Sequence, residues 1–84
     1  MSKILKLIEK MLRLPAEMRF EDVVKVLEFF GWNLENVNGS HFVYYKEGFL
    51  PLTVVRHKNR VKRECIRKII GILNLEEWYE EREK

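Results

Sequence analysis

The two histidines of this chain stand where an imidazole could act on a phosphodiester bond. His41 follows the turn signal Asn38-Gly39 and opens an apolar and aromatic run, and His57 follows the extended run 52–55. Histidine is the side chain that most readily exchanges a proton near neutral pH. Attack of a ribose 2′-hydroxyl on its own phosphate needs such a base, together with cations for the developing phosphorane. His41 is therefore a candidate general base, although a histidine beside a turn more often only hydrogen-bonds the backbone.

Positive charge is concentrated in one segment that begins directly before His57. The net charge of the chain is +3, residues 1–55 are balanced, and residues 56–68 carry seven basic side chains against one acidic side chain. A basic segment of this kind is typical of a phosphate-binding surface, and a solvated helix face is the plainer alternative. The side chains that we expect to bind RNA phosphates are Arg56, Lys58, Arg60, Lys62, Arg63 and Arg67.

Length and composition limit the class of protein. The 84 residues are enough for one domain, and the 46% hydrophobic and 35% charged shares are those of a soluble globular protein. No apolar stretch is long enough to span a membrane. Cys65 is the only cysteine, so we expect a reducing, cytoplasmic location and no disulfide. The sequence contains no metal-ligand cluster, so we expect no cofactor and no dependence of cleavage on a metal.

Apolar residues at helical spacing predict four helices, over residues 3–13, 20–30, 61–73 and 75–82. Pro15 ends the first helix, because the residue before a proline avoids the helical region. Gly31 is a natural stop for the second. Asn74 and Glu77 have capping-box spacing ahead of the last helix.

Alternating residues predict three strands, over residues 32–37, 40–46 and 50–55. Asn38-Gly39 predicts a tight hairpin between the first two strands, because both residues readily adopt the positive φ that such a turn requires. Glu47-Gly48 predicts a second turn. Pro51 indicates that the third strand starts on an edge of the sheet.

The order α-α-β-β-β-α-α predicts an α+β fold, in which a three-stranded antiparallel sheet carries helices on one face and leaves the other open. Alternation along the strands points His41 to the open face with Tyr45 and Thr53. Hairpin closure brings His41 and His57 to one end of the sheet, where helix 61–73 also begins and its N–H groups can attract phosphate. The residues expected against the helices are Trp32, Leu34, Phe42, Tyr44, Leu52 and Val54.

Four ordered segments carry a resemblance to a known family. They are Gly31-Trp32 after a helix, Gly39-Ser40-His41 at a strand start, Thr53–His57 at a strand end, and the basic helix from Val61. With these spacings, residues 14–75 resemble the HicA (YcfA-like) family of toxin–antitoxin mRNA interferases. Val55 replaces the proline usual before the second histidine, and a stretch that often contains glycine reads Lys62-Arg63-Glu64 here.

The resemblance implies a fold like that of a double-stranded-RNA-binding domain, cleavage of single-stranded mRNA, and a HicB-like antitoxin as partner. It implies that the histidine of Gly-Ser-His, here His41, is catalytic. Ser40 and His57 are candidates for catalytic support, although a loop role for His57 is the plainer interpretation. The chain would then be a single HicA-like domain over 1–84, with 3–13 as an additional N-terminal helix and 75–84 as a C-terminal helical tail.

Three functional classes remain open from the sequence. The first is a toxin ribonuclease, and the second is a non-catalytic RNA-binding module that uses the same basic surface. The third is an interaction protein in which helix 3–13 mediates assembly. Cleavage that depends on His41 would select the first, and salt-sensitive binding without cleavage would select the second.

Overall fold

Four helices and five strands make up residues 3–83, the part of the chain that the computed structural model describes. The predicted α+β class and the predicted order of helices and longer strands are confirmed. None of the helices in the described range is long and apolar enough to cross a membrane. The helices are α1 (Lys3–Leu12), α2 (Phe20–Phe29), α3 (Arg63–Leu73) and α4 (Leu75–Glu83), and the strands are β1 (Glu17–Arg19), β2 (Asn33–Asn38), β3 (His41–Tyr45), β4 (Leu52–Val55) and β5 (Arg60–Lys62).

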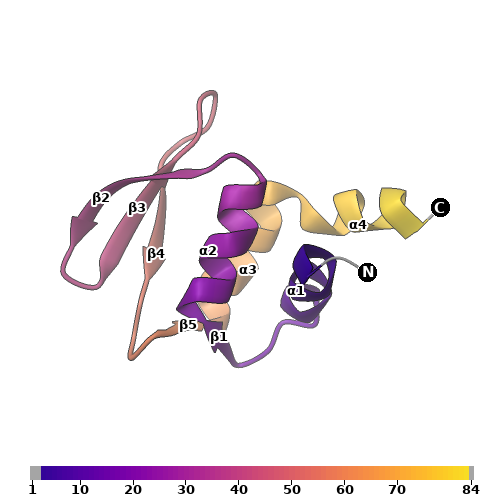
Figure 1. The fold of residues 1–84 in the computed structure, drawn as a ribbon, viewed down its shortest axis with the longest axis horizontal. Coiled ribbons are helices and arrows are strands. Elements are labelled where there is room, and N and C mark those ends of the chain that lie inside the picture. Colours follow the sequence, from indigo (N-terminus) through magenta and orange to yellow (C-terminus); the bar gives the residue numbers. More distant parts are fainter. Residues whose placement is uncertain (1–2, 84) are drawn as a thin grey trace.

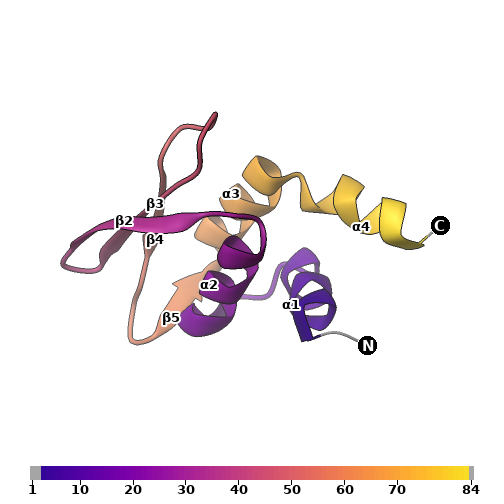
Figure 2. The ribbon, with the colours of Figure 1, turned by 45° about the horizontal axis from the view of Figure 1, so that its top comes forward.

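The elements lie in three layers (Figures 1 and 2). The β2-β3-β4 sheet forms the first layer, α2 and α3 cover one of its faces, and α1 and α4 lie beyond those two helices. The Tyr79 hydroxyl donates a hydrogen bond to the Glu9 carboxylate and so joins α4 to α1. All four helices lie on the same side of the β2-β3-β4 sheet, so its other face is uncovered.

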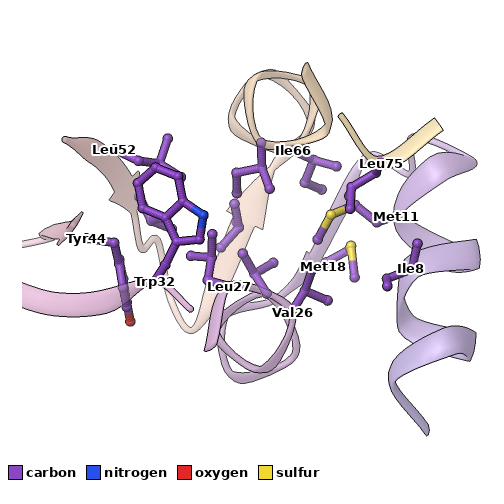
Figure 3. Packing of buried hydrophobic residues seen from close by; sticks show 14 residues of the cluster. Ile8, Met11, Met18, Val26, Leu27, Trp32, Tyr44, Leu52, Ile66 and Leu75 are labelled. Carbon is purple, nitrogen blue, oxygen red and sulfur yellow. The ribbon is translucent and has the colours of Figure 1, made fainter. Parts of the chain in front are cut away.

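One continuous core joins the layers (Figure 3). Ile8 and Met11 of α1 are fully buried in it, as are Leu27 of α2 and Ile66 of α3. Trp32 and Leu52 extend the same cluster to the sheet. The apolar stripe of α1 is therefore used mainly within its own chain, with Ile4, Leu7 and Leu12 partly buried against the same core.

Gly31 directs the chain from α2 into the sheet. Its φ of +87° lies in the region that favours glycine, and its N–H donates to the Glu28 carbonyl at 3.0 Å. The Trp32 N–H donates to the Leu27 carbonyl, also at 3.0 Å, which completes a Schellman motif. The motif satisfies the last carbonyls of α2 and turns the Trp32 side chain into the core, where it is 1% exposed.

The sheet is antiparallel in the order β2-β3-β4, and β4 forms one edge, as Pro51 predicts. His41 pairs with Asn38 on one side and with Val55 on the other. Because Asn38 is already paired, the hairpin turn consists of Gly39 and Ser40, and only Gly39 has positive φ, at +63°. The prediction that Asn38 is a turn residue with positive φ is therefore wrong by one position, and the turn has the φ pattern of type II′.

Leu34 is half exposed, so its predicted packing against the helices is wrong. It pairs with Tyr44, which is buried, and therefore lies on the expected face. The helices do not reach that far, however, because β2 is the edge strand remote from them (Figure 1). Every residue of β2 is exposed as a result.

A second, two-stranded sheet was not predicted. β1 and β5 pair through Glu17 with Lys62, Met18 with Val61 and Arg19 with Arg60. The first three residues after the β4–β5 turn are therefore extended, and α3 begins at Arg63 instead of residue 61. Val61 is buried as expected, but from a strand and not from a helix.

A tight turn connects β4 to β5. His57 and Arg60 exchange two backbone hydrogen bonds of 2.8 and 2.9 Å, and the two residues between them both have positive φ, +49° at Lys58 and +63° at Asn59. Two such residues are the pattern of a type I′ turn. Asparagine tolerates this conformation well, whereas lysine is strained in it.

Replacement of Lys58 by glycine should therefore stabilise the fold. Relief of the strain, about 1–2 kcal/mol, exceeds the added freedom of glycine in the unfolded chain, about 0.5–1 kcal/mol. We expect Lys58→Gly to raise the free energy of unfolding by about 0.5–1 kcal/mol, measured by urea denaturation. A lower midpoint than that of the natural chain would contradict the strain argument.

Candidate functional site

His41 opens β3 on the uncovered face of the sheet. Its cross-strand neighbours on that face are Asn38 and Val55, and the next pair along the strands is Val43 with Thr53. The His41 side chain is exposed and has no hydrogen-bond or ion-pair partner among residues 3–83. A solvent-exposed imidazole without a partner is free to exchange a proton with a bound substrate.

A hollow of about 340 Å³ borders this face where α3 passes the free edge of β4. Thr53 and Val55 line it from the strand. The charged residues that line it are Lys62, Glu64 and Lys68, and the Lys62 ammonium also lies 3.7 Å from the Glu17 carboxylate. Because Val55 pairs with His41, the hollow begins one residue across the sheet from the imidazole. Lys68 was not among the predicted phosphate ligands. The spacing of Lys62 and Lys68 in the sequence does not predict that they line one hollow, because Lys62 belongs to β5 and only Lys68 belongs to α3.

Cys65 also lines this hollow, but its environment does not favour the thiolate form that a nucleophile requires. Burial raises the pKa of the thiol, while a hydrogen bond with the Val55 backbone and the charge of Lys68 act in the opposite direction. The sulfur lies 3.9 Å from the Thr53 carbonyl oxygen, within reach of a weak S–H hydrogen bond. A thiol that stays protonated is a poor nucleophile, so Cys65 belongs to the packing between α3 and β4.

A second hollow, of about 420 Å³, lies on the other side of the sheet end. Arg56 points there, because it follows Val54 by two residues and shares the covered face with Phe42. Its guanidinium lies 5.1 Å from the centre of the Phe42 ring and 5.6 Å from that of Phe20. The residues that line this hollow are Arg19, Phe20, Glu21, Arg56, Lys58, Asn59 and Arg60.

The predicted basic cluster is thus divided between two surfaces. Arg56, Lys58 and Arg60 line the second hollow, and Lys62 lines the first. Arg67 is exposed on α3 and lines neither. Arg19, which sequence reasoning missed, joins the second hollow because β1 pairs it with Arg60.

Arg63 has a structural contact instead of a place in either hollow. Its Nε donates to the Leu14 carbonyl at 3.0 Å and to the Pro15 carbonyl at 3.4 Å. Its backbone N–H donates to the Ala16 carbonyl at 2.9 Å, so the first N–H group of α3 is not available to phosphate. The expectation that the start of this helix attracts phosphate then rests on the N–H groups that follow Arg63 and stays a prediction.

His57 and Ser40 lie at the same end of the sheet as His41, as hairpin closure predicts. The Ser40 carbonyl accepts a hydrogen bond of 2.9 Å from the Arg56 N–H, which extends the β3–β4 pairing to the turn. His57 is exposed and belongs to the β4–β5 turn, where its backbone pairs with Arg60. Among residues 3–83, no group of three or more histidine, cysteine or acidic side chains is arranged to hold a metal ion.

The contact of Arg63 with the segment before β1 generates a prediction. Arg63→Gln removes a charged donor from two carbonyls and frees Leu14, whose φ is +55°. We expect the free energy of unfolding to fall by about 1 kcal/mol in urea denaturation. Arg67→Gln is the matched control on the same helix and should unfold like the natural chain. Equal midpoints for the two variants would show that the contact does not contribute.

Comparison with known proteins places these features in context. The family model of the HicA toxin of bacterial toxin–antitoxin systems matches residues 20–75, which is more than half of the chain. The matched range begins with α2 and ends at the first residue of α4, so it contains both histidines and both hollows except for Arg19. Searches of curated proteins and of solved structures found no match.

Proposed function

The chain belongs to the HicA toxin family, and from that premise we propose that it is an endoribonuclease, an mRNA interferase that cleaves single-stranded RNA with His41 as general base. The observation that carries the proposal is the exposed, unpartnered imidazole on the open face of the sheet, next to a hollow lined by two lysines and one glutamate. An open face admits a nucleic acid strand, and the lysines supply charge where a phosphate would lie.

The proposed reaction follows from these groups. Neutral His41 takes the proton of a ribose 2′-hydroxyl, the 2′-oxygen attacks the adjacent phosphorus, and the bond to the 5′-oxygen breaks. The products are a 2′,3′-cyclic phosphate and a 5′-hydroxyl, whose proton comes from an acid or from water. Lys62 and Lys68 stabilise the charge that develops on the phosphorane. His57 is the candidate acid, and Ser40 is a candidate hydrogen-bonding group beside the base.

Substitution of His41 tests the proposal. We expect His41→Ala to slow cleavage of single-stranded RNA by about 10²- to 10⁴-fold, because it removes general-base catalysis. The assay is run in EDTA, in which the natural chain should still cleave. Arg13→Gln, which changes an exposed side chain outside both hollows, is the control and should cleave like the natural chain, whereas His57→Ala should lose part of the activity as the candidate acid. Equal cleavage by the natural chain and His41→Ala would rule out the proposed role.

A non-catalytic RNA-binding module is the second candidate, and one observation favours it. The hollow with the most cations, which Arg19, Arg56, Lys58 and Arg60 line, contains neither histidine. Binding of RNA that weakens with salt, without cleavage under any condition, would select this function.

Membership of a toxin–antitoxin family implies an antitoxin partner. We infer that this partner is a HicB-like protein. A small reading frame for such a protein next to the gene of this chain is the expected finding, and co-expression of the two proteins should suppress RNA cleavage. Unchanged cleavage in the presence of the co-purified neighbour would contradict the inference.

A further inference from the structure

We propose that the hollow between the start of α2 and the β4–β5 turn binds a phosphate of the RNA backbone other than the phosphate on which His41 acts. We call this hollow the rear pocket. It is lined by Arg19, Phe20, Glu21, Arg56, Lys58, Asn59 and Arg60. The inference rests on RNA being the ligand, which the proposed function and its alternative share.

The charge of the rear pocket selects an anion. Four cations from two chain segments, residues 19–21 and 56–60, line it against one carboxylate, that of Glu21. Glu21 lies 3.7 Å from Arg19, and Glu17 lies 3.8 Å from Arg60, and the side chains of both pairs are about half exposed or more. Exposed ion pairs of this kind contribute little, so a phosphate can displace them.

Arg56 is already oriented for a phosphate. Its guanidinium stacks near the rings of Phe20 and Phe42, which themselves pack with centroids 4.7 Å apart. A stacked guanidinium keeps its N–H groups in the plane, where they can bind two phosphate oxygens at once. The side chain therefore loses little freedom when a ligand binds.

The strained backbone of Lys58 also supports a phosphate site in the rear pocket. It occupies a turn position with a φ of +49°, where glycine would be less strained. The turn presents its ammonium group at the rim of the rear pocket. Strain of this kind is concentrated at functional sites, and here it accompanies three further cations.

The side chains, and not the end of a helix, form the site. The Phe20 N–H, at the start of α2, already donates to the Asn59 carbonyl at 2.8 Å. This bond closes the β4–β5 turn against α2 and fixes Lys58 and Asn59 at the rim. The rear pocket thus has a hydrogen-bonded backbone on one side and exposed cationic side chains around it.

Two different phosphates are required by the geometry of the sheet. His41 lies on the uncovered face with Val55, whereas Arg56, the next residue along, points to the face that the helices cover. A strand of RNA that contacts both must pass around the end of the sheet, near the β4–β5 turn (Figure 1). The rear pocket then anchors the strand at a distance from the reacting bond.

Lys58→Gly tests the proposal without loss of the fold, because this change should stabilise the chain. Arg19→Gln is the second variant, and Arg13→Gln, which removes an exposed cation remote from the rear pocket, is the matched control. The measurement is the affinity of the full chain for single-stranded RNA with 2′-O-methyl riboses, which cannot be cleaved through the 2′-oxygen, over a range of salt concentrations.

We expect both rear-pocket variants to bind this RNA several-fold to about tenfold more weakly and to lower the slope of log affinity against log salt by about 0.7. Arg13→Gln should bind like the natural chain. Natural affinity in both Lys58→Gly and Arg19→Gln, or an equal loss in Arg13→Gln, would overturn the proposal.

Cleavage assays separate this inference from the proposed function. A dinucleoside monophosphate contains only the phosphate on which His41 acts and has none for the rear pocket. Lys58→Gly should therefore cleave it at the natural rate while cleaving long RNA with a raised KM. Unchanged RNA affinity in the variants, together with normal cleavage by the natural chain, would overturn the rear-pocket proposal and leave the nuclease proposal standing. Loss of RNA affinity in the variants, with no cleavage by the natural chain, would overturn the nuclease proposal and support the rear pocket.

Discussion

The pairing of β3 with β4 is the constraint on which the candidate site depends. It sets His41 opposite Val55 and Ser40 opposite Arg56. Because side chains alternate across a strand, this register sends the imidazole to the open face and the guanidinium to the covered face. A slip by one residue would exchange the two faces and bury polar groups. A single hydrogen-bonding pattern thus creates two chemically different surfaces at one end of the sheet.

Several contacts hold this register from the side of the helices. The Schellman motif at Gly31 anchors Trp32 in the core just before β2, and Phe20 packs on Phe42 in the middle of the pairing. The backbone of Asn59 bonds to the start of α2, which fixes the chain as it leaves β4. The uncovered face contributes little to this support. Its residues are therefore freer to serve binding and chemistry than those of the covered face.

The sequence predicted the parts of the fold that have a local period or a strong turn signal. The helices, the three longer strands and the placing of Phe42 and Tyr44 follow from such signals. β1 and β5 do not, because three residues are too few for a period and their pairing joins positions far apart in the chain. Leu34 lies on the predicted face of the sheet, but the helices do not extend over it. The extent to which the layers overlap cannot be predicted from the alternation of residues.

The division of the basic cluster was also beyond the sequence. Arg56 and Lys62 are close in the chain, yet the strand and the type I′ turn between them send their side chains to different hollows. Arg63 contacts carbonyls 48 and 49 positions earlier, a partnership with no local signal. Local charge density predicts a basic surface, whereas the turn divides its side chains between two hollows. His41 remains a proposed catalytic residue on the strength of its type, its place in the motif and its exposure.

The small β1–β5 sheet crosses the boundary of the family match. β1 lies before residue 20 and β5 lies after it, and Met18 and Val61 are buried together where they pair. A protein cut to the matched range would therefore leave Val61 uncovered and Arg60 without the strand that aligns it. The folded unit of this chain therefore extends beyond the segment that matches the family model. The residues of β1 contribute to the fold although they lie outside that segment.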